Sequence, residues 1–186
     1  MSRVLVFSGL LLIAVPATSW GNPLEEAVKR TGTGTVECTY NARAGVFGNG
    51  DWIVTPNHGW RGGSARGNDC ESGPVRLTLR VRDGKVTDLD TSIGRKAREQ
   101  GTDLGLLPVA EVEAFLFDLA ATGDEDIAED AVFALTLADD PAIWNRLLDF
   151  TRDTRIPVRA RGRALFWLAG YDEPEVTAYF EALILD

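Results

Sequence analysis

Three side chains that suit acid–base or ligand chemistry lie in one Gly- and Asn-rich stretch, residues 45–73. They are Asp51, His58 and Asp69. A histidine near carboxylates suits proton transfer or the binding of a small ligand, and Ser64 in the same stretch would add a hydroxyl nucleophile. No Gly-x-Ser-x-Gly turn surrounds Ser64. A small-ligand or hydrolytic site in residues 45–73 is therefore one hypothesis for the function. It is the alternative to the non-catalytic function that we expect from the rest of the chain.

Metal and phosphate chemistry have weaker support. His58 is the only histidine, whereas zinc needs three or four suitably spaced ligands. The acidic run 124–130 lacks the central glycine and oxygen spacing of a calcium loop. The glycines at 45, 48 and 50 could suggest phosphate binding, but no helix start or Lys-Ser/Thr pair follows them, and a backbone with positive φ explains them. We expect no metal ion and no other cofactor.

Residues 1–21 have the layout of a secretory signal peptide. Arg3 precedes an apolar run over 4–15, and the small residues Ala17, Ser19 and Gly21 suit cleavage. The run is about a dozen residues, whereas a membrane-spanning helix needs roughly 20. We expect export to the periplasm or beyond, with no membrane insertion after cleavage.

The only two cysteines, Cys38 and Cys70, form an even number in a chain expected to be exported. That combination predicts a disulfide, which would stabilise the fold by roughly 3–4 kcal/mol in the chain-entropy model. Two free, buried thiols are the alternative.

Residues 22–95 predict a short helix followed by a small antiparallel β region. Asn22 and Pro23 suit a helix start. Strands are predicted over 35–40, with positions 36, 38 and 40 on one face, and over 75–81. Asp83-Gly84 predicts a tight hairpin, and the slip in alternation near Thr87 predicts a β-bulge.

Residues 96–186 predict stacked helices. Pro108, Pro141 and Pro174 recur every 33 residues, each before an apolar helical stretch. Such a period is typical of arrays of helix pairs. The predicted helices lie near 108–121, 125–138, 141–152, 157–169 and 174–184. The predicted fold class is α+β, a small disulfide-tethered β region followed by a short helical array.

Four segments carry a resemblance to a known group of proteins: CESGPVR at 70–76, VRDGKVTDL at 81–89, DLG at 103–105 and ALFWL at 164–168. The chain resembles bacterial secreted proteins with a small β region and HEAT-type repeats. The resemblance implies a HEAT-like helical array and export of the protein. It implies no particular activity. That group commonly has Val-Cys-Gly where this chain has Val46-Phe47-Gly48. In the group, the cysteine of Val-Cys-Gly would pair with the cysteine that precedes Gly-Pro-Val. If so, the resemblance implies that Cys38 takes the place of the Val-Cys-Gly cysteine in this chain.

The net charge differs between the β region and the helical part of the chain, and this difference limits the class of partner. Residues 22–100 carry 12 Lys/Arg against 10 Asp/Glu, and residues 101–186 carry 6 against 18, a net of −12. An acidic array excludes nucleic acid as its partner, because phosphate contacts need a basic surface. A helical array offers a broad rigid surface, so we expect a non-catalytic protein-binding or scaffolding module. The basic positions 76, 80, 82 and 85 are expected to face the acidic helices or solvent.

Two contact sites are expected on the array. Trp144 fills a repeat slot that is polar in the other two proline-opened helices (Glu111 and Thr177), and Leu148 lies one turn later. A tryptophan in such a slot is either a local repacking or a partner anchor. The last helix ends in apolar residues 183–185, and we expect it to pack against a second copy or a partner.

Overall fold

The computed structural model describes residues 21–50, 52–56, 59–61, 70–94 and 100–185. The expected leader, residues 1–21, therefore lies almost wholly outside the described part. In chain order the elements are α1 (Pro23–Thr31), β1 (Gly34–Tyr40), β2 (Phe47–Asn49), β3 (Trp52–Thr55), β4 (Gly59–Arg61), β5 (Val75–Arg82), β6 (Lys85–Ile93), β7 (Thr102–Leu106), α2 (Val109–Thr122), α3 (Glu125–Thr136), α4 (Ile143–Arg152), α5 (Val158–Leu168) and α6 (Pro174–Leu185).

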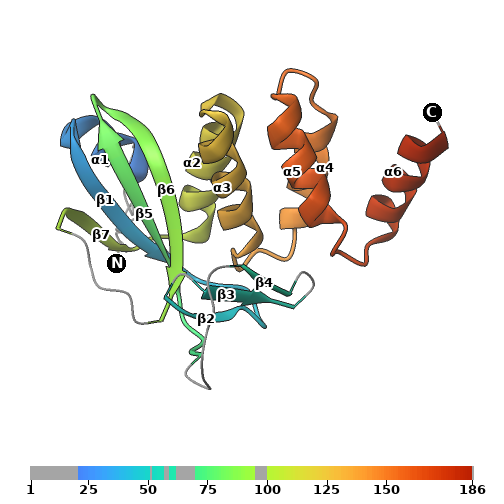
Figure 1. Cartoon of the computed structure of the whole chain (residues 1–186), viewed down its shortest axis with the longest axis horizontal. Helices are drawn as coiled ribbons and strands as arrows, with labels where there is room; N and C mark the ends of the chain where they lie inside the picture. Colours follow the sequence, from blue (N-terminus) through green and yellow to red (C-terminus); the bar gives the residue numbers. More distant parts are fainter. Residues whose placement is uncertain (1–20, 51, 57–58, 62–69, 95–99, 186) are drawn as a thin grey trace, which may run out of the picture.

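A four-stranded sheet in the order β6-β5-β1-β7 forms one end of the molecule (Figure 1). β1 pairs antiparallel with β5 and parallel with β7. Val36, Cys38 and Tyr40 are fully buried on one face of β1, as the alternation predicts. α1 packs beside this sheet. The Asn22 side chain caps the N-terminus of α1 by accepting a hydrogen bond from the Leu24 amide.

The hairpin between β5 and β6 confirms two sequence predictions. Asp83 and Gly84 have φ of 52° and 70°, the left-handed pair that a tight two-residue hairpin requires. The register then slips, because Val81 pairs with Val86 while Arg80 pairs with Asp88. Thr87 is the extra residue, so the bulge lies where the broken alternation predicts it.

A second, antiparallel sheet of β2, β3 and β4 lies within residues 45–73. Gly48 in β2 approaches the neighbouring strand closely, since an added Cβ would lie 2.4 Å from the Trp52 carbonyl oxygen. The glycines at 45 and 50 have φ of 80° and 64°. Positive φ therefore accounts for Gly45 and Gly50, as the sequence predicts, whereas the close approach of a neighbouring strand accounts for Gly48.

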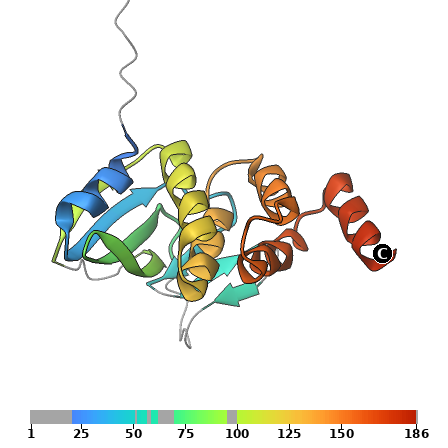
Figure 2. The same cartoon turned by 90° about the horizontal axis from the view of Figure 1, so that it is seen from above.

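The helices follow the sheet in two packed pairs and a final single helix. α2 packs on α3, α4 on α5, and α3 on α5, and α6 lies at the end remote from the sheet in both views (Figures 1 and 2). Pro108 immediately precedes α2, Pro141 lies two residues before α4, and Pro174 opens α6. The 33-residue period therefore marks equivalent helix starts. Among the described helices, none is long and apolar enough to cross a bilayer.

The sheet and the helices share one hydrophobic core. The chain after β1 hydrogen-bonds to the α3–α4 connection through Arg43 N to Leu137 O at 2.9 Å and Asp139 N to Asn41 O at 3.0 Å. The buried Tyr40 hydroxyl donates to the Ala134 carbonyl at 2.7 Å. The buried apolar side chains form one continuous cluster, and the chain is a mixed α+β protein with a small β region followed by helices.

The predicted Cys38–Cys70 disulfide is wrong, because both thiols are free. Cys38 lies opposite Leu77 in the middle of the four-stranded sheet. Cys70 comes seven residues before Leu77, next to Glu71, which pairs with Gly48 of the second sheet. Cys70 therefore lies outside the ladder in which Cys38 is paired. Burial raises the pKa of the Cys38 thiol to about 12, so Cys38 packs as a small apolar residue.

Candidate functional site

The alternative ligand-site residues Asp51, His58 and Asp69 lie outside the described residues, as does Ser64. No described contact brings them together, so a site there stays a hypothesis drawn from the sequence. Within the described residues, no three His, Cys or carboxylate side chains gather in a way that could hold a metal ion.

Two of the four basic residues of the β5–β6 hairpin, Arg76 and Arg80, form ion pairs with carboxylates of the same sheet. The Arg76 guanidinium lies 3.3 Å from the Glu37 carboxylate, and Thr78 also donates to Glu37. Arg80 lies 2.6 Å from Asp88. Arg76 and Arg80 therefore pair across neighbouring strands rather than with the acidic helices.

The two predicted partner contacts on α4, Trp144 and Leu148, differ in burial. Trp144 is half-buried and packs against the core. Leu148 is 1% exposed, so its assignment as a partner contact is wrong. Its repeat slot also holds Phe115 of α2, which is 9% exposed. This slot is therefore buried in both α2 and α4.

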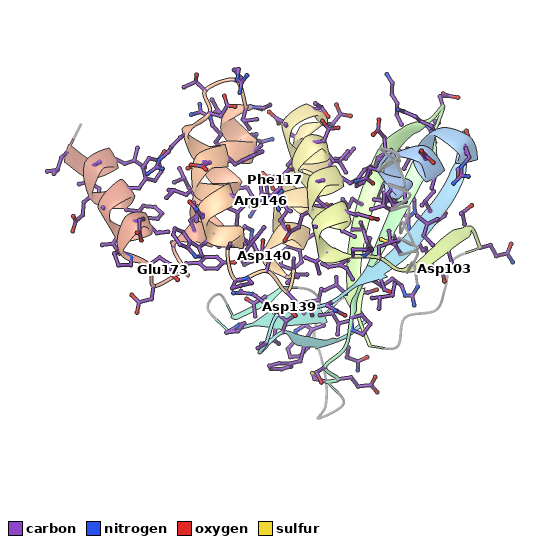
Figure 3. The ribbon with its side chains drawn as sticks, turned by 180° about the vertical axis from the view of Figure 1, so that it is seen from behind. Asp103, Phe117, Asp139, Asp140, Arg146 and Glu173 are labelled. Carbon is purple, nitrogen blue, oxygen red and sulfur yellow. The ribbon has the colours of Figure 1, made fainter. Side chains whose placement is uncertain are left out.

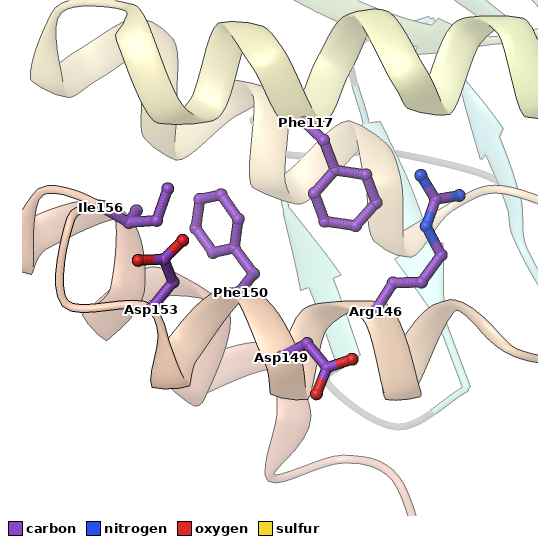
Figure 4. A pocket seen from close by; sticks show the side chains of 6 residues that line it. All are labelled: Phe117, Arg146, Asp149, Phe150, Asp153 and Ile156. Atoms are coloured by element: carbon purple, nitrogen blue, oxygen red, sulfur yellow. The ribbon is translucent and has the colours of Figure 1, made fainter.

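An open groove lies between α2 and α4 and has a cavity volume of about 290 Å³. Phe117 projects into it from α2, Phe150 comes from α4, and Ile156 closes one end from the α4–α5 connection (Figure 4). The ring centroids of Phe117 and Phe150 are 5.8 Å apart and the rings are tilted by 50°. The floor is therefore apolar, and the rim is charged: Arg146, Asp149 and Asp153.

Arg146 and Glu113 fix one wall of the groove. The Arg146 guanidinium lies 4.4 Å from the centre of the Phe117 ring and forms an ion pair with Glu113 of α2. Phe117 and Arg146 lie close together between the two helices in Figure 3. The Glu113 side chain is 3% exposed, and burial, with a smaller contribution from Asp140, raises its pKa to about 7 despite Arg146. Its Oε1 atom is buried without a hydrogen-bond partner in the described part of the chain.

The acidic rim has one fixed and one exposed carboxylate. Arg155 donates to both oxygens of Asp153, at 2.9 and 2.6 Å, and these bonds lower the pKa of Asp153 to about 2. Asp149 is 73% exposed, with the Arg152 guanidinium at 3.6 Å. Asp149 is therefore the rim carboxylate most available to an incoming positive charge.

The 33-residue period places these side chains. Phe117 and Phe150 occupy the same repeat slot, as does Leu183 in α6, and Glu113 and Arg146 also share a slot. Stacking equivalent helices brings equivalent positions together, so both pairs meet between α2 and α4. The groove was not predicted from the sequence, although an alignment of the α2 and α4 repeats would have indicated both contacts.

The groove is small, with an apolar floor and a charged rim. Its volume lies just below the roughly 300–1,000 Å³ typical of small-molecule pockets, and its lining includes the carboxylates of Asp149 and Asp153. An apolar hollow with a charged rim matches an inserted side chain of another protein. Comparisons of the chain with protein-family models, curated proteins and solved structures gave no match.

Proposed function

We propose that this chain is a non-catalytic protein-binding module of the HEAT-like type, exported to the periplasm or beyond, that holds its partner in the α2–α4 groove. The observation that carries the proposal is the groove itself. Phe117, Phe150 and Ile156 offer an apolar surface beside the charged side chains of Arg146 and Asp149. Interface hot spots have this composition, an apolar centre within a polar rim.

The partner we propose is a protein segment with an apolar anchor next to a basic residue. The anchor would lie on the two phenylalanine rings, and the basic residue would reach Asp149. Residues 101–186 carry a net charge of −12, with 6 Lys/Arg against 18 Asp/Glu. Such a field favours the approach of a basic surface and speeds association at low ionic strength.

The test captures exported proteins of the native host on the immobilised chain and quantifies each by mass spectrometry. Asp149→Arg reverses the exposed rim charge, and Ile156→Arg fills one end of the groove. Loss of a hot-spot contact costs at least about 2 kcal/mol, so each variant is expected to lower capture of the true partner by at least ~10-fold. The captured protein should also bind less tightly as salt is raised.

Glu26→Arg on α1 is the matched control, because it makes the same charge change at an exposed position on the sheet end. It should leave capture unchanged. Thermal melts of all three variants check that the fold persists. Capture that is equally strong for the native chain and both groove variants would contradict the proposal.

A further inference from the structure

The end of the molecule remote from the sheet is unusually apolar. Seven large apolar side chains are exposed among the described residues, and five belong to α5 and α6. These five are Val158, Phe166, Leu183, Ile184 and Leu185. Concentrated exposure of this kind marks an interaction surface.

α5 and α3 occupy equivalent places in the 33-residue repeat, so the face of α3 that α5 covers has an equivalent face on α5. Arg159 and Arg163 of α5 form ion pairs with Glu125 and Glu129 of α3, and the Phe133 ring lies 5.1 Å from the Trp167 ring. The covered positions of α3 are thus 125, 129 and 133. One 33-residue period later, the same slots on α5 hold Val158, Gly162 and Phe166. Val158 is 74% exposed and Phe166 is 54% exposed, so no described helix covers this face as α5 covers α3.

Two helical faces at this end have matching patterns. One face of α5 consists of Val158, Arg161, Gly162 and Leu165. One face of α6 consists of Ala178, Glu181, Ala182 and Leu185, all exposed. Both follow the i, i+3, i+4, i+7 spacing of a single helix face. Each places an apolar residue first, a charge second, a small residue third and a leucine last, and the two charges are opposite.

The small residues permit a close approach of the two helices. Nothing lies within 4 Å of a Cβ built on Gly162, and alanines occupy two of the four positions on the α6 face. Arg161 makes a hydrogen bond from Nε to the Ile156 carbonyl at 3.1 Å, and its charge slightly lowers the pKa of Asp153. Its position on the α5 face places its positive charge where Glu181 of a docked α6 would lie.

We propose that a second copy of this chain occupies this end, with α6 of each copy packed on α5 of the other. A two-fold interface requires a surface that is complementary to itself. This end meets that requirement because it carries both matching faces. Charge agrees, since Arg161 is the one charged residue of the α5 face and Glu181 the one charged residue of the α6 face. This goes beyond the proposed function, because the groove lies between α2 and α4.

Sedimentation equilibrium of the chain without residues 1–20, which retains every described element, tests the proposal. We expect a monomer–dimer equilibrium within about 1–100 µM, the range of a modest interface. Arg161→Glu and Glu181→Arg each place like charges together at both contacts, so each should raise the dimer Kd at least ~10-fold. Arg82→Glu, a charge reversal on the β5–β6 hairpin, should leave it unchanged.

Mixing the two single variants is the decisive step. In the mixed dimer, one contact keeps the native Arg161–Glu181 pair and the other holds the reversed pair. The mixture should therefore dimerise about as tightly as the native chain, although neither variant does so alone. If either variant loses its helical circular dichroism signal, Ala182→Arg replaces it as a single disruptive change.

Three results would overturn the proposal: a native chain that stays monomeric up to about 100 µM, single variants that dimerise like the native chain, or a mixture no tighter than its components. These results are independent of capture through the groove. A monomeric chain whose capture still depends on Asp149 would overturn the dimer and leave the proposed function intact.

Discussion

Glu113 is a buried carboxylate that positions the groove. Its ion pair with Arg146 holds the guanidinium over the Phe117 ring, so the wall of the groove depends on a residue that a partner does not touch. Burial disfavours the charged form of Glu113 and raises its pKa to about 7. Unfolding exposes the carboxylate and returns its pKa to about 4.5.

We predict that Glu113→Gln changes how stability depends on pH. Between pH 4.5 and 7 the folded chain keeps a proton on Glu113 that the unfolded chain has lost. The native chain therefore loses stability as pH rises through this window, on the order of 2 to 3 kcal/mol for a shift of this size. Glutamine does not titrate. Urea unfolding at pH 5 and pH 8 should show the variant gaining that amount relative to the native chain.

Glu111→Gln is the matched control, since Glu111 is exposed two residues away on the same helix. Its stability relative to the native chain should be the same at both pH values. An equal difference between Glu113→Gln and the native chain at pH 5 and pH 8 would contradict a raised pKa.

For single residues, the sequence predicts helix caps and turns better than it predicts which side chains contact each other. Asn22 as a helix cap and Asp83-Gly84 as a turn depend on local chemistry, and both are confirmed. Cys38 was assigned to a disulfide from the even number of cysteines and the expected export, although the strand register decides which side chains meet. Leu148 was assigned to a surface because it lies one turn after Trp144, although the repeat slot that it shares with Phe115 is buried.

At the scale of elements, Thr87 shows how an insertion is tolerated. The bulge keeps Val86 opposite Val81 and Leu89 opposite Leu79, so both apolar residues reach the core face despite their spacing of three. Beyond the bulge the strand is regular to Ile93, which is 1% exposed. The bulge is therefore a local extra residue between two correctly registered halves of β6.

We predict that deletion of Thr87 is tolerated and deletion of Asp90 is not. Without Thr87 the existing pairs form an uninterrupted ladder, and the loss of one hydrogen bond to the Arg80 carbonyl should cost about 1 kcal/mol. Without Asp90 residues 91–93 move to the opposite face. Gly94 would then take the buried position of Ile93, and the loss of that side chain from the core should cost more than roughly 3 kcal/mol. Urea midpoints of the two deletions compare them directly, and equal losses would contradict the assigned bulge.

Elements with a strong period are predictable here, and short exposed ones are not. The five predicted helices of residues 96–186 match α2 to α6 closely, because each repeats an apolar stripe. β7 was not predicted: its residues are mostly exposed, and its Gly105 has φ of 71°. β2 and β4 have three residues each, too few to show an alternation. β7 is a strand because it pairs with β1, far away in the sequence, whereas β2 and β4 are strands because they pair with the adjacent β3.

At the scale of the whole molecule, the core joins two parts that differ in composition. The sheet end is nearly balanced in charge, whereas the helical part is strongly acidic. Tyr40 and the bridge between Ala42 and Ala138 tie β1 to the end of α3. α6 contributes only Val176 to the set of fully buried side chains. We therefore expect the sheet and α2–α5 to unfold together and α6 to open separately.

Tyr40→Phe tests that coupling. The change removes the buried hydrogen bond to the Ala134 carbonyl and should cost about 1–2 kcal/mol. If the sheet and α2–α5 form one cooperative unit, native-state hydrogen exchange should show the same decrease in the free energy of opening for amides of β1 and of α3. Amides of α6 should exchange faster at the outset and remain unaffected, because α6 opens without global unfolding. Loss of protection in β1 alone would show that the sheet and the helices unfold as separate units.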